Sequence, residues 1–279
     1  MLLVDGAWLE TRLRDPGLRS IDASWYLPAQ GRDARAEYAT SHIPGAVFVD
    51  LSTDLADTSA PLRNSIASPE SLARVFAGRG IGSGHHVVVY DRLGGYSAGR
   101  VWWSLRYAGH ERVSLLDGGF ARWLAEGRPV TADVPRFPPA EFAAKPRPEL
   151  LRGKADVLRA IRSGGVQIVD ARSLARFRGE GEEHTRNKGH IPGSRSVPYD
   201  ANLGGDPPAF KTPAELRAVY ERAGVRLDQP IITTCGSGVT AALAAFALAL
   251  LGHTNVSVYD GSWAEWGDAD DVPIATGDQ

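Results

Sequence analysis

The sequence predicts an α/β protein of two tandem domains, each a mainly parallel sheet with helices on both faces. Two observations predict this fold class. Short β-branched runs alternate with helical segments along the chain, and strands that are apolar throughout are typical of parallel sheets covered on both faces. The chain also repeats itself, because His42-Ile-Pro-Gly45 recurs as His190-Ile-Pro-Gly193 at an offset of 148 residues.

Further matches support the repeat. Ile21-Asp-Ala-Ser24 corresponds to Val169-Asp-Ala-Arg172 at the same offset, and residues 113–123 parallel residues 256–266. Two copies of about 130 residues indicate two domains rather than a solenoid. Five prolines lie between residues 134 and 148, and proline-rich segments form extended spacers. We therefore expect a first domain at 1–134, a linker at 135–148 and a second domain at 149–279.

The β-branched runs and helical patterns place the individual elements. Strands are predicted at 18–22, 47–49, 87–90 and 113–116 in the first half, and at 167–170, 231–234 and 256–259 in the second. Helices are predicted at 154–163, 214–223 and 241–251. The last of these is apolar on all sides, which predicts a buried helix.

Composition excludes several classes of function. Hydrophobic residues make up 43% and charged residues 23% of the 279 positions, as in globular proteins, and the formal net charge of −2 does not favour nucleic-acid binding or a basic membrane-facing surface. The N-terminus lacks the basic region of a signal peptide, and no apolar run approaches the ~20 residues of a membrane span. A single cysteine excludes an intramolecular disulfide and any multi-cysteine metal site. We expect a cytoplasmic protein, since a reducing compartment suits a free thiol.

That cysteine, Cys235, is the candidate nucleophile. The apolar run 231–234 stops at the thiol, a glycine-spaced turn follows, and the predicted helix begins a few residues later. Unpaired N–H groups and the helix dipole at such a position favour an anionic sulfur. Gly236 and Gly238 allow successive N–H groups to point inward around an anion. The alternative is a small buried hydrophobe, but a core cysteine does not need such a loop.

The first copy differs at this position. Alignment of the two strand–loop–helix units places Asp91 where the second copy has Cys235, followed by a longer loop. A carboxylate cannot act as a soft nucleophile toward sulfur. We therefore expect the first domain to be non-catalytic and the second to carry the reactive group.

The paired Asp-Ala segments, His-Ile-Pro-Gly turns and Tyr-Asp-Gly-like segments resemble the two-domain sulfurtransferases of the rhodanese superfamily from about residue 4 to residue 267. The loop Cys235-Gly-Ser-Gly-Val-Thr240 resembles that of the 3-mercaptopyruvate branch, whereas the thiosulfate branch typically has Cys-Arg-Lys-Gly-Val-Thr. The resemblance implies two rhodanese-like domains. It also implies sulfur transfer from a small anionic donor to a thiol, a thioredoxin-like protein or cyanide through a persulfide on Cys235. No metal or organic cofactor is implied.

The resemblance further implies a grouping of Ser237, His42 and Asp33 near the thiol. Ser237 lies two residues after the nucleophile, where it can donate a hydrogen bond to sulfur or to a keto oxygen. His42 has a structural alternative, because His190 occupies the same turn in the second copy although only one copy has a thiol. Both interpretations of His42 stay open at this point.

The donor's carboxylate needs cations at a distance from the sulfur. The resemblance places the substrate-binding arginines before the second His-Ile-Pro-Gly turn, which gives Arg178 and Arg186, and the fork of a guanidinium matches a carboxylate. Thiosulfate is a compact dianion that cations beside the nucleophile would suit better. The remaining expected substrate-binding residues are the loop positions Gly236, Gly238, Val239 and Thr240.

Three alternatives to a 3-mercaptopyruvate sulfurtransferase remain. Thiosulfate:cyanide sulfurtransferase activity is the first, and a non-enzymatic persulfide carrier is the second. A cysteine phosphatase is the third, but such enzymes close a longer loop with an arginine, and residues 236–242 contain no cation.

Overall fold

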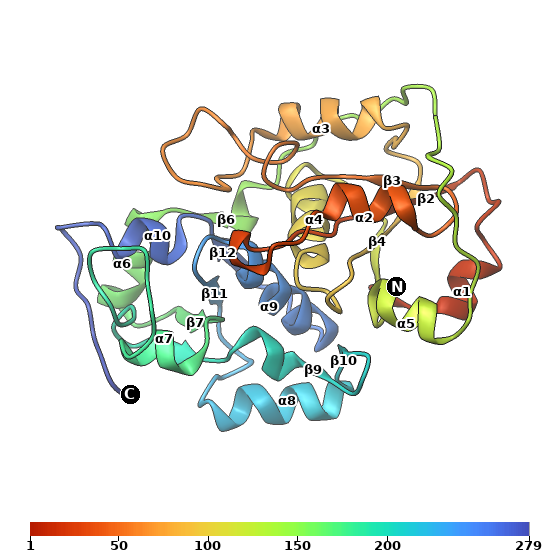
Figure 1. Cartoon of the computed structure of the whole chain (residues 1–279). Helices are drawn as coiled ribbons and strands as arrows, with labels where there is room; N and C mark the ends of the chain where they lie inside the picture. Colours follow the sequence, from red (N-terminus) through yellow and green to blue (C-terminus); the bar gives the residue numbers. More distant parts are fainter. Residues whose placement is uncertain (279) are drawn as a thin grey trace. The chain divides into compact units, whose positions relative to one another are not determined.

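The computed structural model describes residues 1–278, and the chain divides into two compact units (Figure 1). The first comprises residues 1–58, 66–147 and 204–210, and the second contains residues 59–65, 148–203 and the chain from 211 onward. Each is described by itself below.

The first unit is built on a five-stranded sheet with the order β1-β5-β4-β2-β3, in which every pairing is parallel. Its strands are β1 (Leu3–Val4), β2 (Leu18–Asp22), β3 (Ala46–Phe48), β4 (His86–Tyr90) and β5 (Val113–Leu116). Its helices are α1 (Gly6–Glu10), the 3-10 turn η1 (Pro28–Gln30), α2 (Ala34–Thr40), α3 (Pro69–Gly78), α4 (Ala98–Tyr107) and α5 (Gly119–Ala125).

The second unit repeats this plan with a parallel sheet of order β6-β12-β11-β7-β8. Its strands are β6 (Leu151–Arg152), β7 (Gln167–Asp170), β8 (Arg195–Ser196), β11 (Ile231–Thr234) and β12 (Val256–Tyr259). Its helices are η2 (Pro148–Leu150), α6 (Lys154–Ser163), α7 (Leu174–Arg178), η3 (Tyr199–Asn202), α8 (Pro213–Arg222), α9 (Val239–Leu250) and α10 (Ser262–Trp266). Between η3 and α8 in the chain, β9 (Leu203–Gly204) and β10 (Ala209–Phe210) form a two-stranded ribbon, of which residues 204–210 belong to the first unit.

Both faces of the second sheet are buried, as the apolar strands predict. Successive side chains of a strand point to opposite faces, and β11 shows this directly. Ile232 packs in a cluster with Val157 and Ala160 of α6, whereas Ile231 packs in a separate cluster with Leu216 of α8. Helices therefore cover the sheet on two sides, and the carboxyl ends of its strands are left for a site.

The helix after Cys235 is buried as predicted. Every residue of α9 from Val239 to Leu248 is buried. The helix begins two residues earlier than predicted, because Gly238 takes a left-handed conformation (φ +78°) and directs the chain into the first turn. Its alanine-rich sequence favours the helix, and tertiary packing accounts for its complete burial.

Most predicted elements have the observed bounds, but the short edge strands were not predicted. Strands β2, β5, β7, β11 and β12 and helix α6 have the predicted limits, while β3, β4 and α8 are displaced by one residue at one or both ends. β1, β6 and β8 contain two residues each. Two residues carry no periodicity, so only their pairing with β5, β12 and β7 reveals these strands.

The proline-rich segment contains no helix or strand between residues 132 and 147. Its backbone nevertheless bonds to the first unit: the Ala140 and Lys145 N–H groups donate to the carbonyls of Ala77 and Ala108, at 3.0 and 2.9 Å. The segment is thus extended and held along the first unit. The domain limits 1–134, 135–148 and 149–279 stay a prediction.

Candidate active site

Cys235 follows the carboxyl end of β11, the strand between β12 and β7 in the second sheet. Its thiol is free, and the residue is 2% exposed. Its carbonyl accepts the Trp263 N–H at 2.9 Å, and its own N–H donates to the Ser262 hydroxyl oxygen at 3.2 Å. The backbone at the thiol is therefore fixed to the turn between β12 and α10.

The loop after the thiol presents backbone donors at the start of α9. Within residues 1–278, the N–H groups of Gly236, Ser237 and Val239 have no hydrogen-bond partner. Gly236 and Ser237 are partly exposed, whereas Val239 and Thr240 are buried. Unpaired donors at a helix N-terminus favour a negative charge in front of them.

The first unit shows what the equivalent loop binds. Asp91 follows β4 as Cys235 follows β11, and the Phe120 N–H donates to the Asp91 carbonyl at 2.8 Å, just as Trp263 does in the second copy. The Asp91 carboxylate is fully buried. It accepts backbone N–H groups at 2.7–2.9 Å from four residues: Leu93, Gly95, Ser97 and Ala98. In the first copy this position is thus an anion site occupied by the chain's own carboxylate.

Ser262 holds the Cys235 backbone at the cost of an unfavourable conformation. Its φ is +48°, a left-handed value that L-residues other than glycine rarely adopt. The first copy has Gly119 at the equivalent place, with φ +56°. The Ser262 hydroxyl donates to the Tyr259 carbonyl at 2.7 Å while it accepts the Cys235 N–H. Serine at this position therefore gains two hydrogen bonds that glycine cannot make.

An ion-pair network, buried at Asp170, Arg172 and Glu183, reaches the loop through the partly exposed Arg176. Arg172, with a fully buried side chain, pairs with Asp170 at 2.6 Å and with Glu183 at 2.8 Å. Glu183 also pairs with Arg176 at 2.7 Å. Burial alone would lower the pKa of Arg172, but the charges of Asp170 and Glu183 outweigh it, so the pKa is raised. A Cβ atom on Gly236 would lie 3.1 Å from an Arg176 nitrogen, so this guanidinium lies against the loop.

Helix geometry separates the arginines near this turn. Residues two apart on an α-helix point in nearly opposite directions, and Arg176 and Arg178 both belong to α7. Arg176 faces the Cys235 loop, whereas Arg178 pairs with Asp278 at 2.6 Å. Arg186, with 59% of its side chain exposed, pairs with Asp270 at 2.8 Å. Within residues 1–278, neither Arg178 nor Arg186 forms a hydrogen bond or ion pair with residues 235–240, and their role as carboxylate-binding arginines stays a prediction.

The two turn histidines have matching environments. His42 Nδ1 lies 2.8 Å from the Tyr38 carbonyl oxygen and its ring stacks on Tyr38, while His190 Nδ1 lies 2.9 Å from the Phe177 carbonyl oxygen and stacks on Phe177. Both rings are buried. This likeness supports the structural interpretation of the two side chains. A catalytic role of His42 stays a prediction.

Asp33 lies in the first unit, as His42 does, at the start of a helix. Its carboxylate caps α2 by accepting the N–H groups of Arg35 and Ala36, both at 3.0 Å. Ser237 lies in the second unit, and its hydroxyl has no partner within residues 1–278. The grouping of these residues with the thiol stays a prediction.

Sequence reasoning missed Arg176, Glu183 and Ser262. Glu183 belongs to a run of charged residues that usually stays in solvent, so its burial had no local signal. Arg176 could be recognised as the arginine that faces the loop only once α7 was known, because that helix directs its side chain opposite to that of Arg178. Ser262 carried a usable signal, because the repeat aligns it with a glycine that follows another glycine.

Residues 1–278 contain no group of three or more His, Cys, Asp or Glu side chains arranged to hold a metal ion. In the same range, no helix has the length and apolar character that crossing a bilayer requires.

Comparisons with known proteins agree with this architecture. The sequence profile of the Rhodanese-like domain matches residues 6–126 and 154–269. The 3-mercaptopyruvate sulfurtransferase of Homo sapiens is 41% identical over 273 residues, which cover 95% of this chain and 91% of the relative. The thiosulfate sulfurtransferase of Cricetulus griseus is 43% identical over 274 residues, with 95% and 91% covered. A crystal structure from Escherichia coli, described as a 3-mercaptopyruvate sulfotransferase, has a TM-score of 0.86 and 40% identity, and the match covers 94% of this chain and 99% of that chain.

Proposed function

This chain belongs to the rhodanese family, and from that membership we propose that it is a sulfurtransferase that takes sulfur from 3-mercaptopyruvate through a persulfide on Cys235. One observation carries the proposal. The free thiol occupies the place at which the other copy binds a carboxylate with four backbone N–H groups. The same kind of loop in the second copy supports an anionic sulfur.

The first half-reaction forms the persulfide. The Cys235 thiolate attacks the donor sulfur, and an S–S bond forms as the carbon–sulfur bond of the donor breaks. The electron pair of that bond leaves with the three-carbon fragment as the enolate of pyruvate, which takes a proton to become pyruvate. The N–H groups of Gly236, Ser237 and Val239 stabilise negative charge on the transferred sulfur, and Ser237 positions or protonates the leaving fragment.

The second half-reaction transfers the outer sulfur from Cys235 to an acceptor. A thiolate or cyanide acceptor attacks the outer sulfur, the S–S bond breaks, and its electron pair returns to Cys235 as thiolate. Small thiols, a thioredoxin-like protein and cyanide are the acceptor classes that fit this displacement. A reducing compartment such as the cytoplasm would keep the thiol free between turnovers.

The identity of the loop residues supports 3-mercaptopyruvate as the donor. The relatives named for the two donors have similar identities, 41% and 43%, so overall similarity does not separate them. The segment Gly236-Ser-Gly238 carries no charge next to the thiol, which suits a donor whose carboxylate is remote from its sulfur. Arg178 and Arg186 are the proposed partners of that carboxylate.

Thiosulfate is the second candidate donor, and Arg176 is the observation that favours it. This guanidinium lies against Gly236 and supplies a cation beside the loop from another element. Glu183 pairs with it through both carboxylate oxygens, at 2.8 and 2.7 Å, which offsets most of its charge. The offset favours 3-mercaptopyruvate over the dianion.

The test is persulfide formation followed by turnover. Protein incubated with 3-mercaptopyruvate and freed of the donor is expected to gain about 32 Da, one sulfur atom, on the peptide that contains Cys235. Cys235→Ser removes both the adduct and the activity, and Ser237→Ala, which retains the thiol, keeps the adduct but forms it more slowly. Sulfur transfer by Cys235→Ser, or a donor-treated wild type without an adduct, overturns the proposal.

Kinetics separate the alternatives. A higher kcat/KM for thiosulfate than for 3-mercaptopyruvate would indicate that thiosulfate is the donor, and the chain would still be a sulfurtransferase of the rhodanese family. An adduct acquired only from a persulfidated partner protein, with no turnover of either small donor, would indicate a carrier. Hydrolysis of an aryl phosphate would indicate a phosphatase, and none is expected.

A further inference from the structure

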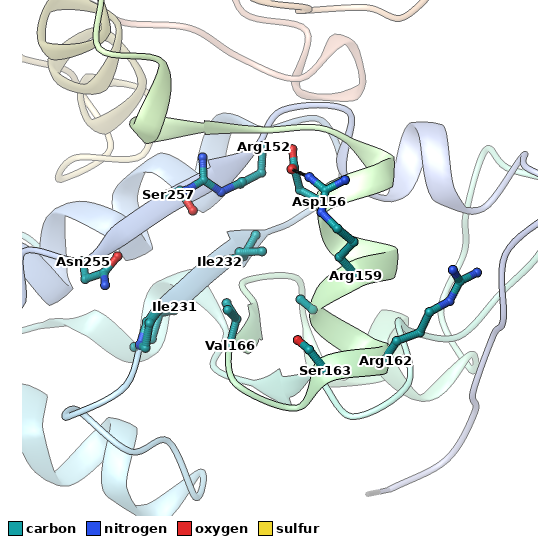
Figure 2. A pocket seen from close by; sticks show the side chains of 12 residues that line it. Arg152, Asp156, Arg159, Arg162, Ser163, Val166, Ile231, Ile232, Asn255 and Ser257 are labelled. Carbon is teal, nitrogen blue, oxygen red and sulfur yellow. Dashed lines mark hydrogen bonds and ion pairs between the residues drawn. The ribbon is translucent and has the colours of Figure 1, made fainter.

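The second unit contains a cavity of about 560 Å³ at the end of the sheet opposite to Cys235. It lies between α6 and the beginnings of β11 and β12, and Figure 2 shows the side chains around it. β11 runs from Ile231, which lines the cavity, to Thr234, next to the thiol. The cavity is therefore separate from the proposed sulfur-transfer site, and that reaction assigns no role to it.

In the first copy, side chains of the protein fill the equivalent position between α1 and the beginning of β4. Trp8, the third residue of α1, packs edge-on against His86 with ring centroids 5.3 Å apart. The Arg12 guanidinium lies 4.4 Å from the centre of the Trp8 ring. His86 Nε2 lies 2.8 Å from the Ser114 hydroxyl oxygen, and that hydroxyl lies 2.8 Å from the Met1 carbonyl oxygen. An aromatic ring and a satisfied hydroxyl thus occupy the space.

Strand register identifies the equivalent residues of the second copy. β1 pairs Leu3 with Leu115, and β6 pairs Leu151 with Val258, so the helices that follow these strands superimpose without a gap. Asp156 is the third residue of α6 and takes the place of Trp8. By the same register Pro230 replaces His86, and Ser257 corresponds to Ser114. The second copy therefore lacks the indole and imidazole rings, and the cavity is the space that they leave.

The walls of the cavity combine an apolar surface with unpaired polar groups. Ile232 and Ala160 belong to the buried core between α6 and the sheet and supply an apolar surface. Ser257 corresponds to a hydroxyl that has two partners in the first copy, yet within residues 1–278 its own hydroxyl has none. Asn255 and Ser163 add further polar groups to the rim.

The charge of the lining is predominantly positive. Three guanidinium groups, those of Arg152, Arg159 and Arg162, face one carboxylate, that of Asp156. Arg159 pairs with Asp156, and Arg162 extends away from the strands in Figure 2. β6 pairs Arg152 with Tyr259, two residues beyond Ser257 on β12, so the two side chains extend from the same face of the sheet. Within residues 1–278 the Arg152 guanidinium donates one hydrogen bond, to the adjacent Leu151 carbonyl at 2.8 Å. Within residues 1–278, Arg152 and Arg162 therefore have no acidic partner, and Arg152 is the one of the two that lies on the side of the unpaired Ser257 hydroxyl.

We propose that this cavity binds an aromatic anion, a planar ring that bears a carboxylate or a phosphate. The ring takes the place that the first copy fills with its own Trp8, against Ile232 and Ala160. The anionic group meets the Arg152 guanidinium and the Ser257 hydroxyl, as charge-assisted hydrogen bonding requires. The volume is within the range of small-molecule sites, which combine apolar walls with a few convergent polar groups.

Indole-3-acetate is the probe, because it joins the ring of Trp8 to a carboxylate. Its binding is measured by calorimetry and by chemical-shift changes of backbone amides in the full chain. Saturable binding is expected at sub-millimolar to millimolar concentrations, with shifts at the first residues of β11 and β12. 3-Methylindole supplies the ring without the charge, and acetate supplies the charge without the ring, so each is expected to bind at least about tenfold more weakly. Phenyl phosphate tests whether phosphate replaces carboxylate.

Two variants locate the site. Asp156→Trp restores the residue of the first copy and is expected to abolish binding while sulfur transfer by Cys235 is retained. Because Asp156 also accepts the Gly153 N–H at 2.9 Å, the substitution removes a helix cap. Arg152→Gln, which removes no such contact, is therefore the second variant, and it is expected to weaken indole-3-acetate about tenfold without changing 3-methylindole.

Arg162→Gln is the matched control, because its guanidinium points away from the strands, and it is expected to leave the affinity unchanged. The proposal is overturned if indole-3-acetate does not saturate or if Arg152→Gln binds it like the wild type. It is also overturned if Arg178→Gln, and not Arg152→Gln, removes binding, since the probe would then occupy the proposed sulfur-donor site.

Discussion

At Ser262 the free energy lost to a left-handed backbone conformation can be compared with the stability that two side-chain hydrogen bonds provide. Its φ of +48° costs an L-residue about 1–2 kcal/mol relative to ordinary backbone. In return its hydroxyl accepts the buried Cys235 N–H and donates to the Tyr259 carbonyl, at 3.2 and 2.7 Å. Ser262→Ala keeps the strain and loses both bonds, whereas Ser262→Gly loses the bonds and releases the strain.

The two variants are expected to differ in a fixed order. Leaving a buried donor such as the Cys235 N–H without an acceptor costs about 1–3 kcal/mol, so both unfold more easily than the wild type. Ser262→Gly regains about 1–2 kcal/mol of strain but gives back about 0.4–1 kcal/mol through the greater freedom of glycine in the unfolded chain. At the midpoints of these ranges Ser262→Gly is therefore expected to be the more stable variant by about 0.8 kcal/mol, or about 2–3 °C in Tm.

Calorimetry of the three proteins measures this order, and the rate of persulfide formation on Cys235 provides a second readout. Both variants release the backbone at the thiol, so the rate is expected to fall about tenfold in each. If Ser262→Ala equals or exceeds Ser262→Gly in Tm, the strain argument is wrong. If both match the wild type in rate, the hydroxyl does not position the nucleophile.

Three other substitutions test buried charges by chemical denaturation. Glu183→Gln leaves the buried Arg172 and the partly exposed Arg176 without a shared carboxylate and is expected to cost about 3 kcal/mol, whereas the exposed neighbour Glu182→Gln changes little. Asp91→Asn points an amide donor at backbone donors and is expected to cost about 2 kcal/mol. Asp22→Asn is expected to stabilise the protein at pH 7 by on the order of 1 kcal/mol, because Asp22 is fully buried and its Oδ2 has no partner within residues 1–278. Burial raises the pKa of Asp22 above 3.8, so ionisation of Asp22 destabilises the folded wild type as pH rises. The gain in stability from Asp22→Asn is therefore expected to disappear in acid, where Asp22 is protonated. A gain that does not change with pH would contradict this reason.

The repeat allowed both parallel sheets to be predicted from the sequence. Strands such as 167–170 and 231–234 have the predicted bounds because each is a continuous apolar run that is buried on both faces. The edge strands Leu151–Arg152 and Arg195–Ser196 were beyond reach, since two residues become a strand only through the neighbour that pairs with them. Long-range pairing, and not local propensity, forms these edges.

The candidate site divides in the same way. Cys235 and its glycine loop were identified from local order alone, because a strand that ends at a thiol before a helix places the sulfur at unpaired N–H groups. The residues that support this loop, Arg176 and Glu183, could not be identified from local order, since Glu183 is buried only when its segment folds over Arg172.

The sequence by itself determined two copies of one fold, and which copy carries a thiol where the other carries a carboxylate. These are properties of neighbouring residues and of their repetition. Only the tertiary structure decided that Arg176 rather than Arg178 faces the loop, that Ser262 holds the Cys235 N–H, and that the place of Trp8 is empty in the second copy. The physical reason is that burial, pairing and cavities depend on which distant segments pack together.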